Sequence, residues 1–249
     1  MTRHHFLTLC IGLPASAVAL VQPCPGEPAA TPENLVTRQL RDIIIPMIAF
    51  ESITLEEACD FFQFRSGELA ADKKGLKIEI EAMENKPPRI DSLRFRGVPI
   101  GVALAYVAEK THTRLQVAAD RVRFVATKPG DAGGAKAADF ANVKAAPVSD
   151  PKTIVIPSVI FEDIILDEAI DFVRLRSCEL DPAGHRGINI VSFVDAAKAK
   201  RIAKLKMKDV TVKALLEAIA AATGTKVVFG THAVEFRALP EKLKSALPR

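Results

Sequence analysis

Paired acidic residues are the first feature of this 249-residue sequence that could do chemistry. Five charged positions occur twice, at a constant separation: Glu51/Glu162, Glu57/Glu168, Asp60/Asp171, Arg65/Arg176 and Glu68/Glu179. Two carboxyl groups held close together could perform general acid–base or glycoside chemistry. The same residues also have helical spacing, in which acidic groups favour the helix N-terminus and an arginine pairs with a glutamate three residues later. Because one catalytic centre needs no duplication, we favour the structural interpretation and predict no catalytic residue.

Histidine and serine residues are not spaced as in a metal site or a hydrolase. His112, His185 and His232 show no His-x-x-x-His or Cys/His spacing, which zinc sites typically have. Ser66 and Ser177 lie on the apolar face of a predicted helix and lack the flanking glycines of a nucleophile elbow. We therefore predict no metal, no cofactor and no enzymatic activity.

Basic residues recur on one face of two predicted strands. Successive side chains of a strand alternate between its faces, so Leu205 and Met207 are expected to point into the core and the intervening lysines outward. The candidate interaction surface that results contains Arg94, Arg96, Lys204, Lys206 and Lys208. This surface either binds acidic partners, lipid headgroups or acidic envelope polysaccharide, or it is a solvated face that discourages pairing of sheet edges.

Two phenylalanines lie one helical turn before two arginines, as Phe61/Arg65 and Phe172/Arg176. At this spacing a cation–π contact can form on the surface of a helix. Such a pair could bind a partner, and we include these four residues in the candidate interaction surface. The alternative is that each phenylalanine packs between its helix and a sheet.

The composition excludes several classes of protein. The chain is 49% hydrophobic and 26% charged, which is too apolar for a disordered protein. It contains no Trp and one Tyr, so a nucleic-acid site built on stacked aromatic residues is not expected. The net charge of +4 is too small to indicate a polyanionic partner by itself.

The first segment has the character of a secretory signal peptide. Arg3 precedes an apolar run over 6–21, and Ala17 and Ala19 suit cleavage after Ala19. We expect residues 1–19 to direct export to the periplasm, with a transmembrane anchor as the alternative. The odd number of cysteines in the exported part favours free thiols over a disulfide framework. These cysteines are Cys24, Cys59 and Cys178.

The chain contains an internal duplication. Residues Ile43–Leu69 align without a gap on Ile154–Leu180, at an offset of 111, and 15 of the 27 positions are identical. From Gly75, which aligns with Gly187, the offset becomes 112. A period this long indicates two globular modules rather than a solenoid.

Six segments follow from this duplication. We predict a signal peptide at 1–19, an N-terminal extension at 20–42, a first module at 43–126, a flexible Gly/Ala/Pro-rich linker at 127–152, a second module at 153–238 and a C-terminal tail at 239–249. Within each module the apolar period alternates between two and 3.6 residues. The fold class is therefore α+β, with two repeated small β-α-β-β-α-β-β sandwich modules whose helices cover one face of a sheet.

Local signals mark the start of the first helix of each module. Thr54 and Glu57 form a capping box before a helix that ends near Leu69. The second copy has Ile165 at the cap position, and we expect the N-terminal end of that helix to be less stable. Pro46 lies in the preceding strand and lacks an N–H group, which implies an edge position or a bulge.

Each module ends in a short strand phrase followed by an alanine- and leucine-rich helix. The first copy, from Leu93, reads LRFRGVPIGVALAYVAEKTHTRLQV, and the second, from Leu205, reads LKMKDVTVKALLEAIAAATGTKVVF. These segments resemble the secretin and TonB short N-terminal domain, whose strand ends in L-x-L-x-x-V-P-hydrophobic; the second copy has Thr211 in place of the proline. The resemblance implies periplasmic interaction domains that dock other envelope proteins and are not catalysts.

We therefore expect a non-enzymatic periplasmic docking protein that accepts a partner strand at an exposed sheet edge. The resemblance implies secretin, TonB-like or anti-sigma components as partners. Self-association within a pore assembly is an alternative, and no nucleic acid is expected. The main alternative is a cleft between the modules that binds or hydrolyses a small envelope ligand.

Overall fold

Strands and helices alternate along the chain, and the predicted fold class, α+β, is confirmed. The first half contains α1 (Leu35–Asp42), β1 (Ile44–Thr54), α2 (Leu55–Leu69), β2 (Ile78–Ile80), β3 (Arg89–Pro99), α3 (Ile100–Lys110), β4 (Thr113–Val117), β5 (Val122–Ala126) and a 3₁₀ helix, η1 (Ala137–Phe140). The second half contains β6 (Val155–Ile164), α4 (Leu166–Leu180), β7 (Ile190–Ser192), β8 (Ile202–Thr211), α5 (Val212–Thr223), β9 (Thr225–Phe229) and β10 (Val234–Ala238).

The computed structural model describes residues 34–81, 88–127, 133–142, 149–184, 186–195 and 199–239. All of them belong to one compact unit, Glu33–Arg249. The predicted signal peptide, Cys24, His185 and most of the predicted C-terminal tail lie outside the described residues. Within the described ranges, no helix has the length and apolar character needed to cross a membrane.

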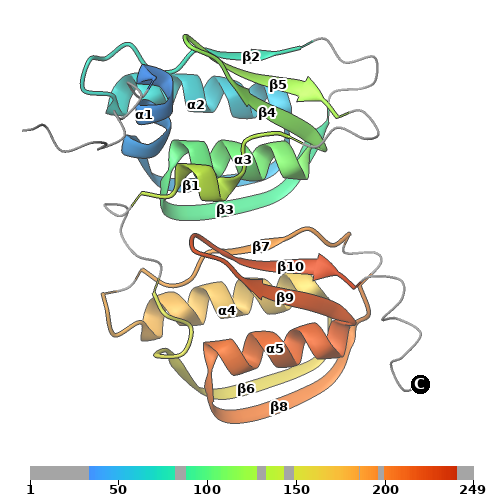
Figure 1. Ribbon diagram of the computed structural model, residues 1–249. Helices are drawn as coiled ribbons and strands as arrows, with labels where there is room; N and C mark the ends of the chain where they lie inside the picture. The colour runs from blue at the N-terminus through green and yellow to red at the C-terminus, as the bar shows by residue number, and fades with distance from the viewer. Residues whose placement is uncertain are drawn as a thin grey trace, which may run out of the picture. The chain divides into compact units, whose positions relative to one another are not determined.

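Each module places two helices between two sheets (Figure 1). In the first module β1 pairs antiparallel with β3, and the other sheet has the order β2-β5-β4, with β2 parallel and β4 antiparallel to β5. The second module repeats this arrangement with β6–β8 and β7-β10-β9. The helices are thus covered on both sides, not on one face of a single sheet as expected, because the two long strands pair with each other and not with the hairpin.

The two-stranded sheets have the same register in both modules. Ile45 faces Val98 in the first, and Ile156 faces Val210 in the second, which are equivalent positions at the offsets of 111 and 112. Each long strand has one neighbour in the described part of its module, so Pro46 lies in an edge strand as predicted. The duplicated residues therefore occupy equivalent places in the two modules.

Helix α2 begins at the predicted capping box, and α4 begins with half of one. Thr54 Oγ1 accepts a hydrogen bond from the Glu57 N–H (3.2 Å), and the Thr54 N–H donates to Glu57 Oε2 (2.7 Å). At α4 only the second bond is present, from the Ile165 N–H to Glu168 Oε2 (2.9 Å). The reason is that an isoleucine side chain offers no acceptor.

The turn after α2 depends on a serine and a glycine. Ser66 Oγ accepts a hydrogen bond from the Leu76 N–H (2.8 Å), and Gly75 has a φ of 67°. A Cβ at Gly75 would lie 2.7 Å from the backbone nitrogen of Gly67, so the turn can approach the helix only with glycine there. Ser177 makes the equivalent bond in the second module (3.2 Å), which gives both serines a structural role.

The first module carries two further elements, α1 and η1, which pack on α3. Phe140 of η1 is 2% exposed, and a Cβ added to Gly101 of α3 would lie 2.5 Å from that ring and 2.9 Å from the Leu40 carbonyl oxygen. The equivalent residue of α5 is Lys213, which forms an ion pair (3.4 Å) one turn along the helix. Part of the segment that we expected to be a flexible linker, 127–152, is thus packed against the first module, because α3 lacks a side chain where Phe140 inserts.

Candidate functional site

The two modules meet where the outer face of β1–β3 covers the β7–β10 part of the second module (Figure 1). Val191 and Ala233 of the second module are each 1% exposed and belong to the hydrophobic cluster of the first. Asn189 bridges to the backbone of β3, since its Nδ2 donates to the Arg96 carbonyl oxygen (3.0 Å) and its Oδ1 accepts from the Arg96 N–H (2.8 Å). We call this contact the junction.

A second group of polar contacts joins α3 to β10 across the junction. The Tyr106 hydroxyl donates to Glu235 Oε1 (2.6 Å), while Arg237 donates to Glu235 Oε2 (2.7 Å) and to Glu109 Oε1 (2.5 Å). The Phe193 ring stacks on Tyr106 (6.0 Å between centroids) and lies 4.4 Å from the Arg237 guanidinium. Burial, followed by the bond to Glu235, raises the pKa of Tyr106. These contacts hold the modules together with charge-assisted bonds.

The junction contains the two predicted arginines of the first basic strand face. Arg94 pairs with Glu51 of its own module and with Asp171 of α4 (3.3 Å). The hydrogen bond to Glu51 raises the pKa of the Arg94 guanidinium, which burial opposes. The Arg96 side chain contacts Cys178 Sγ. In the first module, the predicted interaction surface therefore already binds a protein surface, that of the second module.

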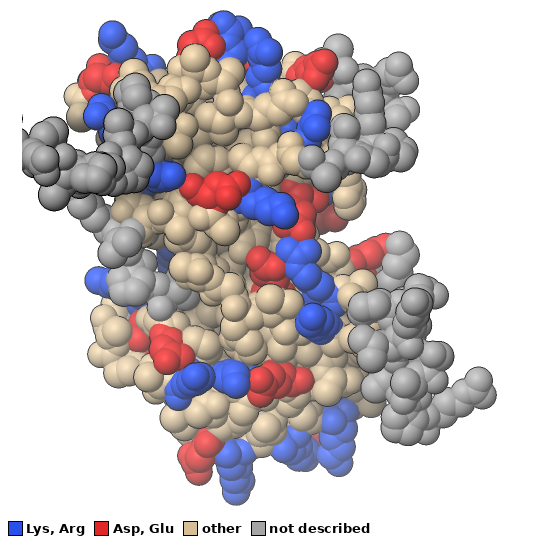
Figure 2. Space-filling view, viewed as in Figure 1, with Lys and Arg blue, Asp and Glu red and all other residues tan. Residues whose placement is uncertain are grey.

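The equivalent face of the second module is open. Lys204, Lys206 and Lys208 are exposed, and Lys206 pairs with Glu162 of β6 (3.3 Å). Ile160 of β6, which is opposite Lys206 in the register of β6–β8, is 62% exposed. Figure 2 shows basic side chains along the lower edge of the second module, where Figure 1 places β6 and β8. The lysines and Ile160 thus form an exposed surface, which we call the β6–β8 face.

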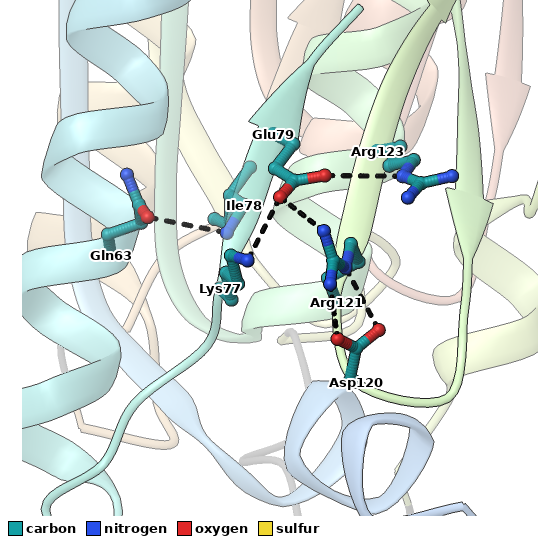
Figure 3. A network of polar contacts seen from close by, with 7 residues as sticks. All are labelled: Gln63, Lys77, Ile78, Glu79, Asp120, Arg121 and Arg123. Carbon is teal, nitrogen blue, oxygen red and sulfur yellow. Dashed lines mark hydrogen bonds and ion pairs between the residues drawn. The ribbon is translucent and has the colours of Figure 1, made fainter.

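The three-stranded sheet of the first module carries a network of ion pairs (Figure 3). Glu79 accepts from Arg121 (2.6 Å) and Arg123 (3.3 Å) and pairs with Lys77 (3.1 Å). Arg121 also binds Asp120 (2.5 Å). The hydrogen bonds from Arg121 and Lys77 lower the pKa of Glu79 to about 2. This sheet face is therefore ionised and solvated.

The two copies of this sheet face differ in character. The positions equivalent to Lys77, Glu79, Arg121 and Arg123 in the second module are Asn189, Val191, Ala233 and Glu235. The second set is mostly uncharged and lies in the junction, whereas the first is charged and exposed or half-buried. Polar outer faces are typical of the terminal repeats of stacked proteins.

Phe61 and Phe172 pack against other rings. The edge-to-face pairs are Phe50–Phe61 and Phe161–Phe172, each with 5.1 Å between centroids. Arg65 and Arg176 bind the glutamates three residues later, at 2.7 and 2.6 Å. Within the described residues, the cation–π contacts lie at Phe193 and Phe229 instead. Helix-to-sheet packing, the alternative considered for these phenylalanines, is the arrangement present.

Burial and local hydrogen bonds shift the pKa values of several other described groups. Burial raises the pKa of the Cys59 thiol to about 12 and lowers the pKa of His232, whose Nε2 is buried without a hydrogen-bond partner. A hydrogen bond from the Thr54 backbone lowers the pKa of Glu57, which caps its helix. Within the part of the chain that the structure describes, no group of three or more His, Cys, Asp or Glu could hold a metal ion.

Apart from Arg94 and Arg96, the residues of the junction were not predicted from the sequence. The sequence prediction used positions that the two modules share, whereas most of the junction uses positions at which they differ. Tyr106, Glu109 and Asn189 have Ala218, Ala221 and Lys77 as their counterparts. This asymmetry between copies is the signal that could have identified them.

Comparison with known protein families, with curated proteins and with solved structures finds no match to this chain. The function of the chain is therefore inferred from the arrangement of its two modules. The outer face of the two-stranded sheet occurs in both modules. In the first module (β1–β3) it contacts the second module, whereas in the second module (β6–β8) it is open.

Proposed function

We propose that this protein is a non-enzymatic docking protein of the cell envelope, and that its β6–β8 face binds an acidic protein surface. The observation that carries the proposal is the junction, where the equivalent face of the first module already binds protein. The resemblance of both modules to the secretin and TonB short N-terminal domain supports a periplasmic partner. The proposal assigns no reaction to the chain.

The junction indicates what the partner surface should contain. Arg94 meets the carboxylate of Asp171, and its equivalent, Lys206, would meet a carboxylate of the partner. Ile160 offers the apolar centre around which affinity concentrates. The lysines at the rim would speed association with an acidic partner and make it sensitive to salt.

A second copy of the chain fits this face poorly. In a head-to-tail stack that repeats the geometry of the junction, the β6–β8 face would meet the charged sheet of another first module. Lys208 stands in the place of Arg96, and Lys77 in the place of Asn189. A lysine side chain has no acceptor, so Lys77 could not repeat the pair of hydrogen bonds that Asn189 makes with the backbone of β3, and we propose a different protein as the partner.

Photo-crosslinking in cells tests this proposal. A photo-reactive amino acid at position 160 is expected to give an adduct with an acidic envelope protein. The same amino acid at position 64 is the control, because Phe64 is 65% exposed and Ile160 is 62% exposed. The Phe64 site lies on α2 of the first module and is expected to give no such adduct.

Charge reversal then tests the role of the lysines. Lys204→Glu combined with Lys208→Glu keeps the Lys206–Glu162 pair and should lower the adduct yield by about tenfold. The matched control is Lys74→Glu combined with Lys226→Glu, which reverses two exposed lysines outside this face. Equal adducts at positions 160 and 64, or equal yields from the two charge-reversed chains, would contradict the proposal.

A further inference from the structure

A small cleft lies between the outer face of β1–β3 and helix α4. Its volume is about 210 Å³. Four arginines and one aspartate supply its charged lining: Arg94, Arg96, Arg174, Arg186 and Asp171. Met47 and Leu175 also line it and are 58% and 60% exposed. The cleft thus combines a strong excess of positive charge with two exposed apolar side chains.

Two of these arginines have unused hydrogen-bond donors. Arg174 donates to Asp171 (2.7 Å) and to the Ile190 carbonyl oxygen, and Arg94 pairs with Glu51 and Asp171. The Nε atoms of Arg94 and Arg174 are nevertheless buried and have no hydrogen-bond partner among the described residues. Buried donors of this kind are normally satisfied by protein, water or a ligand.

Arg186 adds a positive charge that no described carboxylate neutralises. Its backbone N–H binds Asp181 (3.0 Å), but its exposed guanidinium forms no ion pair within the described residues. Asp171, the one acid among the described lining residues, is already shared between Arg94 and Arg174. The lining therefore has more guanidinium groups than carboxylates to neutralise them.

We propose that this cleft binds the phosphate group of a small phosphomonoester, with Met47 and Leu175 in contact with its organic part. Arginine donates planar pairs of N–H groups to phosphate oxygens. A phosphate dianion also matches the excess of positive charge better than a singly charged carboxylate does. The site is separate from the β6–β8 face and does not depend on the docking proposal.

Cys178 provides a direct assay, since it lines the cleft and contacts Arg96. In the full chain with Cys10→Ser and Cys24→Ser, the alkylation rate of Cys178 is measured against the concentration of inorganic phosphate. Bound phosphate is expected to slow alkylation at least about fivefold, by covering the thiol and neutralising the adjacent arginines. Cys59, which is 3% exposed, serves as the internal control for an intact fold.

Two variants and two other anions complete the test. Arg186→Gln should weaken protection by phosphate at least about fivefold, because it removes a charge-assisted donor. Arg38→Gln, an exposed change on α1, should leave protection unchanged. Equal protection by chloride at the same ionic strength, equal protection by acetate, or equal phosphate affinity in the Arg186→Gln and Arg38→Gln chains would overturn the proposal.

Discussion

The hydroxyl of Tyr106 in the first module donates a 2.6 Å hydrogen bond to Oε1 of Glu235 in the second. Arg237 binds the other oxygen of the same carboxylate (2.7 Å). Tyr106 is the single tyrosine of a chain without tryptophan, so its ultraviolet signal reports on the junction alone. The two modules are therefore joined by a contact that can be observed without a label.

The Tyr106–Glu235 hydrogen bond should contribute measurably to stability. Tyr106→Phe and Glu235→Gln are each expected to lower the free energy of unfolding by about 1–3 kcal/mol, because each leaves a partly buried polar partner less well satisfied. The double variant should cost less than the sum of the two, with a coupling energy of about 1 kcal/mol. Denaturant unfolding followed by circular dichroism measures these values. Strictly additive effects would show that the hydrogen bond contributes nothing.

The same pair predicts how stability depends on pH at the alkaline end. Burial and Glu235 raise the pKa of Tyr106, so the unfolded chain loses this proton at a pH of about 10 while the folded chain keeps it. Stability is therefore present below that pH and falls above it, by at most about 1.4 kcal/mol per pH unit. We expect phenolate absorbance in denatured protein, but not in folded protein, at a pH of about 11. A folded-state titration at the ordinary tyrosine pKa would contradict the burial of this group.

Two helical glycines should respond in opposite directions to alanine. Gly101→Ala places a Cβ 2.5 Å from the Phe140 ring, and we expect it to lower the free energy of unfolding by about 1–3 kcal/mol. Gly67→Ala places a Cβ with nothing within 4 Å and should raise it by about 0.5–1 kcal/mol, since alanine favours the helix. Thermal unfolding of both variants measures the contrast. Equal free energies of unfolding for the Gly101→Ala and Gly67→Ala chains would mean that η1 does not pack on α3.

Local sequence signals predicted much of each module. The capping box at Thr54 and Glu57 marked the start of α2, and the alternation of Leu205 and Met207 with lysines showed which side of β8 faces the core. These features depend on neighbouring residues, so they are visible in a short stretch of sequence. The split of each module into two sheets depends on the pairing of strands far apart in the chain, and no local pattern shows it.

The site was predicted only in part, for a related reason. The shared basic positions, Arg94 and Lys206, were found because both modules have them. Unshared residues such as Asn189 and Val191 form the surface that packs against the first module. These residues therefore decide which copy of the sheet face is covered and which is open. Residues that are repeated in both modules do not reveal these positions.

Amide hydrogen exchange at two equivalent residues tests the central claim, that one sheet face is covered in the first module and open in the second. The Arg96 N–H donates to Asn189 across the junction (2.8 Å), and Lys208 occupies the matching place in the register of β6–β8. We predict that the Arg96 amide exchanges at least about tenfold more slowly than the Lys208 amide. Asn189→Ala should speed exchange at Arg96 and leave Lys208 unchanged. Equal exchange rates at Arg96 and Lys208 in the unaltered chain would contradict the account.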